Sequence, residues 1–352
     1  MFVRDLIDLN QLSLDELDDV VDMACRISSH PTHYSSACRD KLMATLFYEP
    51  STRTQMSFQS AMLRLGGKII GFDNPNGTSV AKGESLKDTV MVLSGYTDII
   101  TIRNPLEGAA FAASLYSQVP VINAGDGGHL HPTQTLTDIV TLRNVLGRTE
   151  NLVIGMCGDL KNGRTVHSLC KTMCRYGGNS FVFISTEELG MPQYIKDIIT
   201  RSGCKYTEVR TIEEAMPYLD VLYMTRIQRE RFDSFEEYKA QEGIYVLDEA
   251  KMKLGRPELC VLHPLPRVDE IAYEVDDDPR AYYFKQTLYG MYARMALIIR
   301  LTSDSEKFIP KVPKPTHDFT CHNPKCITQF EKYLPHLTVE TPDGPVCAYC
   351  EH

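Results

Sequence analysis

The stretch Phe47–Gln55, with the sequence FYEPSTRTQ, constrains the fold more than any other part of the chain, because it joins a strand-like segment to a helix-like one. The apolar run Leu42–Tyr48 has the length of a buried strand. After the stretch, apolar residues recur at helical spacing until two consecutive glycines end the pattern. Ser51, at the junction, is a suitable N-cap. The segment therefore predicts a strand that leads directly into an amphipathic helix.

The first turn of that helix has the chemistry of a phosphate site. Backbone N–H groups at a helix start point toward a ligand, and Thr52, Arg53 and Thr54 add two hydroxyls and a guanidinium. Serine and threonine alone would equally fit an ordinary capped helix. Arg53, however, places positive charge at the positive end of the helix dipole, which is unfavourable without an external anion. We therefore predict that residues 51–54 bind a phosphate group.

Strand-like and helix-like segments alternate through most of the 352-residue chain, a pattern typical of doubly wound parallel α/β sheets. A first series ends near residue 145, and a second begins with the buried strand-like run 151–158. We predict two such domains, at residues 1–134, completed by a helix at 290–302, and at residues 135–289. The turn after the run 151–158 lacks the GxGxxG pattern, so a dinucleotide site is weakly supported.

In the first domain, several polar residues lie in loops or follow predicted strand ends, where open α/β sheets bind ligands. Arg103 follows a strand-like run, and His131 lies in a glycine-rich loop after another one. Ser79 and Lys82 lie in a polar, glycine-punctuated surface loop. Each of these side chains can reach an anion. A structural histidine and solvated loop residues remain the alternative interpretations.

In the second domain, Arg164, Arg226 and Arg267 all follow predicted strand ends. A single arginine in such a place is commonly a solvated turn residue. Three of them together favour a site for carboxylates, because a guanidinium binds a carboxylate through two parallel hydrogen bonds.

Composition excludes several classes of protein. The formal net charge of −9 gives no basic field for nucleic acid, and no apolar run approaches the roughly 20 residues of a membrane helix. The N-terminus lacks a signal-peptide pattern. Seven of the eleven cysteines are scattered through predicted helices and strands, as in proteins of a reducing compartment. We therefore expect a cytoplasmic protein with no nucleic-acid or membrane partner.

The C-terminal tail has a different composition. Residues 303–320 are proline-rich with mixed charge and predict an extended linker. Residues 321–352 contain two close cysteine pairs, a strong pattern for a structural zinc site, with a disulfide as the alternative. A segment this small needs metal to fold, so we expect one structural Zn²⁺ per chain. The proposed ligands are Cys321, Cys326, Cys347 and Cys350.

Over residues 1–302, the chain resembles aspartate carbamoyltransferase catalytic chains. The motifs that carry the resemblance, in the same order and spacing, are FYEPSTRT, SVAKGES, HPTQTLTD, GDLKNGRTVHSL, LYMTRIQRER and LHPLPRVDEI. The tail is similar to the zinc domain of the separate regulatory chain that accompanies some of these enzymes, without its nucleotide-binding domain. The resemblance implies transfer of the carbamoyl group from carbamoyl phosphate to L-aspartate in de novo pyrimidine biosynthesis, without an organic cofactor or a catalytic metal. It also implies an active site between the two domains and a homotrimer with shared sites, whose pairing into larger particles stays open.

The resemblance further implies specific roles for the matching residues. The catalytic residues would be Thr54, Arg103 and His131. Carbamoyl phosphate would bind Ser51, Thr52, Arg53, Thr54, Ser79, Lys82, Arg103, His131, Gln134, Leu265 and Pro266. Of these, Ser79 and Lys82 would come from the neighbouring subunit, and the backbone of Leu265 and Pro266 would contact the carbamoyl nitrogen. Aspartate would bind Lys82, Arg164, Arg226 and Gln228.

The chain departs from the family pattern at Gln55, where an arginine is usual, and we expect this change to remove a structural ion pair more than a ligand. Two alternatives to the main interpretation remain. Ornithine carbamoyltransferases share the phosphate half but usually show His-Cys-Leu-Pro, where this chain has residues 263–266, His-Pro-Leu-Pro. A non-catalytic assembly subunit, retained for its tail, is the other alternative. The tail is expected to serve assembly, and it could dock on its own chain or on a neighbouring trimer.

Overall fold

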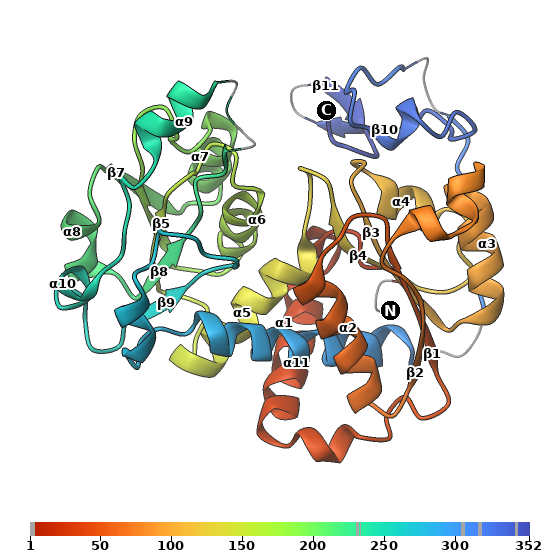
Figure 1. The fold of residues 1–352 in the computed structure, drawn as a ribbon, viewed down its shortest axis with the longest axis horizontal. Coiled ribbons are helices and arrows are strands. Elements are labelled where there is room, and N and C mark those ends of the chain that lie inside the picture. The colour runs from red at the N-terminus through yellow and green to blue at the C-terminus, as the bar shows by residue number, and fades with distance from the viewer. Residues whose placement is uncertain (1–3, 230–231, 233, 304–306, 316–318, 342–343) are drawn as a thin grey trace. The chain divides into compact units, whose positions relative to one another are not determined.

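The computed structural model describes residues 4–229, 232, 234–303, 307–315, 319–341 and 344–352. The chain forms two compact units, Met1–Thr133 with Met291–His352, and Gln134–Gly290. Among the described residues, no helix has both the length and the apolar character needed to cross a membrane. Each unit is built around its own parallel sheet, as Figure 1 shows, so the predicted fold of two doubly wound α/β domains is confirmed.

The first unit contains a parallel sheet with the strand order β2-β1-β3-β4. Its strands are β1 (Leu42–Phe47), β2 (Lys68–Phe72), β3 (Ile99–Asn104) and β4 (Val121–Asp126). Its helices are α1 (Leu14–Ser29), α2 (Thr52–Arg64), α3 (Leu86–Tyr96) and α4 (Ala109–Ser114). Strands β1, β3 and β4 are almost completely buried and begin with apolar residues, which is expected where helices cover both faces of a parallel sheet.

Local signals explain where the first helices begin and end. Ser13 and Glu16 form the capping box that opens α1, in agreement with the sequence pattern. Helix α2 begins after Ser51 and ends before Gly66, whose φ of +82° places it in the left-handed region that stops helices. The polar loop after β2 contains two short 3-10 turns, Pro75–Gly77 and Ser79–Lys82.

The second unit contains a parallel sheet with the strand order β7-β6-β5-β8-β9. Its strands are β5 (Val153–Cys157), β6 (Ser180–Ile184), β7 (Lys205–Val209), β8 (Val221–Met224) and β9 (Cys260–Leu262). Five helices lie within the described part of this unit: α6 (Arg164–Met173), α7 (Gln193–Arg201), α8 (Ile212–Ala215), α9 (Phe235–Gln241) and α10 (Glu249–Met252). A buried apolar cluster that includes Leu222, Leu247 and Tyr283 forms the core on one side of this sheet.

Two helices contribute residues to both units, because the unit boundaries fall inside them. These are α5 (Pro132–Leu146) and α11 (Tyr283–Leu301). The sequence predicted the last helix at residues 290–302, and this start was wrong, because α11 begins at Tyr283. Glycine in a helix costs about 1 kcal/mol relative to alanine. The buried side chains of Tyr283 and Gln286 outweigh that cost and extend the helix toward its N-terminus.

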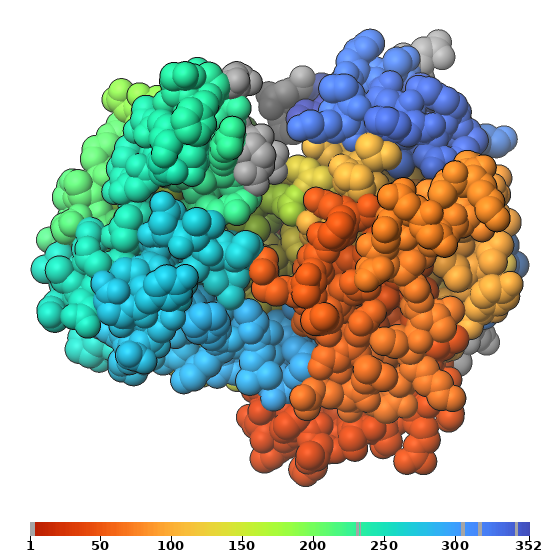
Figure 2. Space-filling model, in the orientation of Figure 1, coloured from red at the N-terminus to blue at the C-terminus, as the bar shows by residue number. Residues whose placement is uncertain are grey.

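The C-terminal tail packs on the first unit of its own chain. Its strands β10 (Thr338–Thr341) and β11 (Gly344–Cys347) form an antiparallel pair. Leu334, Leu337 and Tyr349 of the tail share one buried apolar cluster with residues of α4. In Figure 2 the tail covers the surface near α3 and α4. The described linker residues 307–315 form neither helix nor strand, and the backbone N–H of Phe308 donates to the carbonyl of Gln118 at 2.8 Å.

Candidate functional site

In the first sheet, the predicted phosphate-binding residues lie where the strand order changes direction. Strand β1 pairs with β2 on one side and with β3 on the other, so the switch point lies between β1 and β3. Phe47 stands opposite Arg103 in the register, and the N–H of Tyr48 donates to the Arg103 carbonyl at 2.8 Å. The carboxyl ends of parallel strands at a switch point are where such sheets bind ligands.

The start of α2 follows directly from the end of β1. Ser51 occupies the N-cap position, and its side chain makes no capping hydrogen bond. Thr52 and Arg53 are exposed, whereas Thr54 is buried. The predicted N-cap is therefore correct. The Ser51 hydroxyl is not committed to capping the helix, which suits a side chain that is to bind a ligand.

Arg103 and His131 lie together beside Gly125. A Cβ atom at Gly125 would lie 2.7 Å from Arg103 Nη1, so a larger residue there would displace the guanidinium, and 3.6 Å from His131 Cδ2, an ordinary contact distance. Both residues are buried, each with about 8% of its surface exposed. Arg103 Nη2 lies 3.0 Å from Glu49 Oε2, and Nη1 donates to the Ala124 carbonyl at 3.4 Å. The structure thus brings together Arg103 and His131, which the sequence analysis had identified in two separate segments of the chain.

Asp126 organises the loop that ends at His131. Its Oδ1 accepts from the N–H of Leu130 at 2.8 Å, and its Oδ2 accepts from the N–H of Gly108 at 2.9 Å. His129 Nδ1 lies 3.0 Å from the same Oδ2. Burial opposes protonation of His129, but the carboxylates of Asp126 and Glu351 outweigh it and raise the pKa to about 10. We therefore expect a charged imidazolium in this loop near neutral pH.

Ser79 and Lys82 are not joined to this group of residues within the chain. Both lie on the short 3-10 turn Ser79–Lys82, and both are exposed. Among the described residues, no hydrogen bond or ion pair connects either side chain to Ser51–Thr54, Arg103 or His131. Sequence reasoning expected them to come from a neighbouring subunit, and that expectation stays a prediction.

In the second sheet, the predicted aspartate-binding residues also lie at a switch point, between β5 and β8. The ends of these strands approach closely: a Cβ atom at Gly158 would lie 2.4 Å from the carbonyl oxygen of Thr225. Arg164 is the first residue of α6, which follows β5, and Arg226 and Gln228 follow β8. All three are partly buried.

Arg267, the third arginine of the predicted carboxylate group, has a different role. Both of its terminal nitrogens bind the two carboxylate oxygens of Asp276, and Nη1 also donates to the Tyr283 hydroxyl at 3.2 Å. The interpretation of Arg267 as a free carboxylate ligand was therefore wrong. Its bidentate partner lies nine residues further along the chain, a distance at which sequence alone could not select a partner.

Comparisons with known proteins identify the family. Two family models match, "Aspartate/ornithine carbamoyltransferase, carbamoyl-P binding domain" at residues 4–144 and "Aspartate/ornithine carbamoyltransferase, Asp/Orn binding domain" at residues 150–301. The aspartate carbamoyltransferase catalytic subunit of Clostridium perfringens is 54% identical over 303 residues, which cover 86% of this chain and 99% of that protein. The chain belongs to the aspartate carbamoyltransferase family.

Solved structures of the aspartate carbamoyltransferase family agree with this assignment. The catalytic subunit of the M. jannaschii aspartate transcarbamoylase is 43% identical, with a TM-score of 0.81, over 86% of this chain and 99% of that one. The Trypanosoma cruzi enzyme in complex with carbamoyl phosphate is 34% identical, with a TM-score of 0.78, over 85% of this chain and 96% of that one. The predicted family is confirmed, and aspartate carbamoyltransferase activity is favoured over the ornithine enzyme and a non-catalytic subunit.

The loop with the family motif HPLP is held by a buried histidine. The N–H of Leu265 donates to His263 Nδ1 at 2.7 Å, so His263 Nε2 carries the proton that it shares with Glu270 Oε1, also at 2.7 Å. Burial raises the pKa of Glu270, but hydrogen bonds from His263 and from the Val268 N–H outweigh it and lower the pKa. Leu265 has a φ of +54°, a left-handed conformation that is unfavourable for leucine and that this network holds in place.

Sequence reasoning missed the residues that position Gln134. Gln134 Nε2 donates to Asp138 Oδ1 at 2.8 Å, and Gln286 Nε2 donates to the same oxygen at 2.6 Å. Gln286 Oε1 in turn accepts from the His263 N–H at 3.0 Å. The hydroxyl of Tyr223 donates to Asp138 Oδ2 at 3.1 Å. The available signal was Asp138 four residues after Gln134, a spacing that places two side chains on one helix face.

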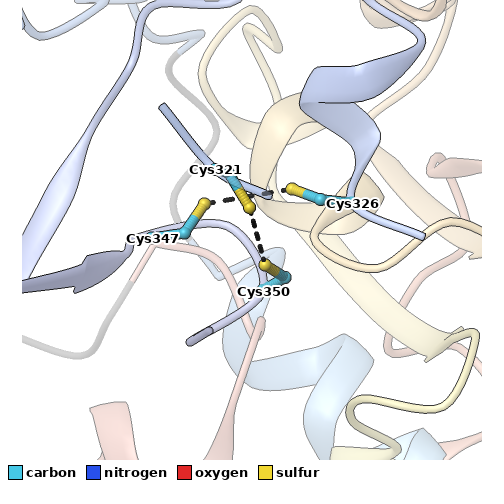
Figure 3. Close-up of side chains that lie close together, drawn as sticks. All are labelled: Cys321, Cys326, Cys347 and Cys350. Carbon is cyan, nitrogen blue, oxygen red and sulfur yellow. Dashed lines mark hydrogen bonds between the residues drawn. The ribbon is translucent and has the colours of Figure 1, made fainter. Parts of the chain in front are cut away.

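The candidate metal centre lies in the tail, beyond the part of the chain that the aspartate carbamoyltransferase family models match. One ligand atom from each of Cys321, Cys326, Cys347 and Cys350 lies within 4.8 Å of the others, and all four residues are buried (Figure 3). The Sγ atoms of Cys321 and Cys350 lie 3.5 Å apart, and those of Cys326 and Cys347 lie 3.9 Å apart.

The spacing of the four sulfur atoms fits a metal site better than disulfide bonds. A disulfide bond needs a sulfur–sulfur distance of roughly 2.05 Å. A tetrahedral zinc with bonds of roughly 2.3 Å places its sulfur ligands about 3.8 Å apart. The four thiols therefore fit a tetrahedral metal ion, and all four cysteines are free.

Proposed function

We propose that this aspartate carbamoyltransferase binds carbamoyl phosphate at the switch point of its first sheet and L-aspartate at that of its second. One observation carries the proposal: in each sheet, a helix start and cationic side chains lie at the carboxyl ends of the two strands that flank the switch point, β1 and β3 in the first sheet and β5 and β8 in the second. Parallel sheets bind ligands at these positions, and both substrates are anions. The products are N-carbamoyl-L-aspartate and phosphate, which makes the reaction a step of pyrimidine biosynthesis.

The proposed chemistry depends on electrostatic stabilisation. The amine of aspartate attacks the carbamoyl carbon, negative charge builds on the carbonyl oxygen, and the bond to phosphate breaks. Thr54, Arg103 and His131 are proposed to donate to that oxygen, and the start of α2 is proposed to hold the phosphate. Thr54 lies on α2, Arg103 lies in β3 and His131 lies directly before α5, so little reorganisation accompanies the reaction. No side chain needs to form a covalent intermediate.

The second unit is proposed to orient the nucleophile and the carbamoyl amide. Arg164, Arg226 and Gln228 would bind the two carboxylates of aspartate. The Leu265 N–H is already used by His263, so the carbonyl groups of Leu265 and Pro266 are the backbone atoms that suit the carbamoyl NH₂. Gln134, oriented by Asp138, is proposed to contact the same group.

Ser79 and Lys82 are proposed to complete the site of a neighbouring copy in a homotrimer. Both side chains point away from the chain's own core, as their exposure indicates. The adjoining edge strand β2 and helix α2 expose Ile70, Met56 and Leu63, the last two by more than half of their surface. An apolar edge of this kind is commonly covered by a partner.

The tail is proposed to hold one structural Zn²⁺ in the described cysteine cluster. Four thiolates complete a tetrahedral shell and leave no position for a substrate or a reactive water molecule, so the metal has no place in the reaction. Five further free cysteines are buried, which supports the proposal of a reducing, cytoplasmic setting: Cys38, Cys157, Cys170, Cys174 and Cys260.

Steady-state assays of the purified chain test the substrate assignment. With carbamoyl phosphate as the donor, L-aspartate is expected to release phosphate and form carbamoyl aspartate, and L-ornithine is expected to be inert. Turnover with ornithine alone would overturn the assignment. Binding of carbamoyl phosphate without any turnover would favour a non-catalytic assembly subunit.

A further inference from the structure

The first contact between the tail and the catalytic unit is made at Glu107, which lies four residues after Arg103. The Glu107 N–H donates to the Lys325 carbonyl at 2.9 Å, and the Ile327 N–H donates to the Glu107 carbonyl at 2.9 Å. Asn323 Nδ2 also donates to Glu107 Oε2 at 2.6 Å. Glu107 is buried, with about 6% exposed. The tail segment around Cys321 and Cys326 is therefore hydrogen-bonded to the segment that follows Arg103.

The second contact is made at His129, two residues before His131. Glu351 Oε2, directly after the ligand Cys350, lies 3.6 Å from His129 Nε2. The other nitrogen of His129 lies 3.0 Å from Asp126 Oδ2. The imidazole thus links a carboxylate of the tail to the carboxylate that organises the loop.

The backbone of Glu351 has a conformation that is uncommon for residues other than glycine and asparagine. Its φ is +59°, in the left-handed region where glycine and asparagine are preferred. Its N–H donates to the Cys347 carbonyl at 2.8 Å, which fixes the residue on the second cysteine pair. A residue with a Cβ in this conformation is held there by surrounding contacts, and the ion pair with His129 is one of them.

The two contacted segments are themselves joined. The Gly127 N–H donates to the Asn104 carbonyl at 2.9 Å, and the Gly108 N–H donates to Asp126. The segment after Arg103 and the loop before His131 therefore form one hydrogen-bonded layer beneath the tail. The side chains of Arg103 and His131 meet beside Gly125 at the end of this layer.

We propose that Glu351 and His129 are positioning residues through which the folded, metal-bound tail sets the affinity of the phosphate half-site. The inference rests on the proposed assignment of Arg103 and His131 to carbamoyl phosphate. Neither positioning residue touches the substrates. They act by holding the loop Asp126–Leu130, so that His131 stays beside Arg103. The tail thereby supports substrate binding in addition to the assembly role that the sequence indicated.

Titration calorimetry with inorganic phosphate, together with steady-state kinetics in carbamoyl phosphate, tests the proposal on the full chain. Glu351→Gln and His129→Gln each break the contact from one side. Each is expected to weaken phosphate binding roughly three- to tenfold and to raise KM more than it lowers kcat. The double variant is expected to be no weaker than His129→Gln alone, because that change already removes the contact with Glu351 together with the one to Asp126. Glu340→Gln, on the exposed strand β10, is the charge-matched control and should match wild type.

The metal content of each variant, measured by elemental analysis, shows whether a change affects only the position of the loop or also unfolds the metal-bound tail. Unchanged metal with weakened phosphate binding supports the proposal. If Glu351→Gln loses metal, the phosphate affinity of His129→Gln tests the proposal instead, because that variant leaves the tail sequence intact. Wild-type phosphate affinity in His129→Gln, or effects that simply add in the double variant, would overturn the inference. Inactive wild-type protein that binds no phosphate would instead contradict the proposed phosphate site.

Discussion

The guanidinium of Arg103 lies 3.0 Å from a carboxylate oxygen of Glu49, so the proposed phosphate-binding arginine is paired with an acid from its own motif. Glu49 lies between the end of β1 and the start of α2, and its side chain is 38% exposed. A phosphate that approaches Arg103 therefore meets a carboxylate already in contact with the same guanidinium. Like charges in one site weaken each other's binding.

The first prediction concerns this pair. Glu49→Gln removes the competing charge and is expected to tighten the binding of inorganic phosphate by roughly two- to fivefold, the range that partly exposed ion pairs contribute. Titration calorimetry measures the effect. Glu258→Gln, an exposed glutamate of the second unit, is the matched control. Weaker phosphate binding in Glu49→Gln would mean that the carboxylate orients Arg103 and does not compete.

The second prediction concerns the proposed donors. Arg53→Ala and Arg103→Ala are each expected to lower turnover by on the order of a hundredfold or more, as for loss of a preorganised donor to developing charge. Arg39→Ala, which removes an exposed arginine of the same unit, should retain wild-type kinetics. Steady-state rates with saturating aspartate provide the comparison. A loss of less than tenfold in Arg103→Ala would remove it from the proposed machinery.

The third prediction tests shared sites. Lys82→Ala and Arg53→Ala chains are expected to be inactive alone and to regain activity after dissociation and reassembly as a mixture. In a cyclic trimer with random mixing, roughly a quarter of the sites pair an intact Arg53 with an intact Lys82 from the neighbour. About that fraction of wild-type activity is expected. Mixtures that remain inactive would show that each site is built from one chain.

The fourth prediction concerns the metal. Replacing Cys347 and Cys350 by serine is expected to release the metal, measured by elemental analysis, and to lower the melting temperature, because the apolar surface under Leu334, Leu337 and Tyr349 loses its cover. Turnover should persist, with a raised KM for carbamoyl phosphate. Cys204→Ser, outside the cluster, is the control. Unchanged metal content and melting temperature in the double variant would contradict a structural site.

The fifth prediction follows from the raised pKa of His129. The folded chain holds the imidazole proton up to about pH 10, whereas the unfolded chain releases it near pH 6.5. The resulting stabilisation is fully present below pH 6.5 and is lost as the pH rises toward 10. The free energy of unfolding should therefore fall more steeply over this range in wild type than in His129→Gln. If the free energy of unfolding depends on pH in the same way in both proteins, the raised pKa of His129 is refuted.

Local patterns predicted much of the fold. The capping box at Ser13, the glycine stop at Gly66 and the apolar run of β1 each act over a few residues, and the structure has each of them. Boundaries were less accurate: β3 was expected over residues 96–102, ending at Arg103, and instead spans Ile99–Asn104. Hydrogen bonding to β1 and β4 extends β3, and periodicity within one segment does not report pairing with another.

The sequence by itself determined the family, the two-domain α/β class and the residues expected to carry the chemistry, because motif order and strand-to-helix junctions are local properties. Tertiary structure alone decided which residues meet. Glu49 pairs with Arg103, Gln286 binds Asp138, Arg267 binds Asp276, and Glu351 reaches His129. Most of these partners lie on different elements, and pairs such as His129 and Glu351 are separated by hundreds of residues. Their approach depends on how whole sheets and the tail pack, which no local pattern encodes.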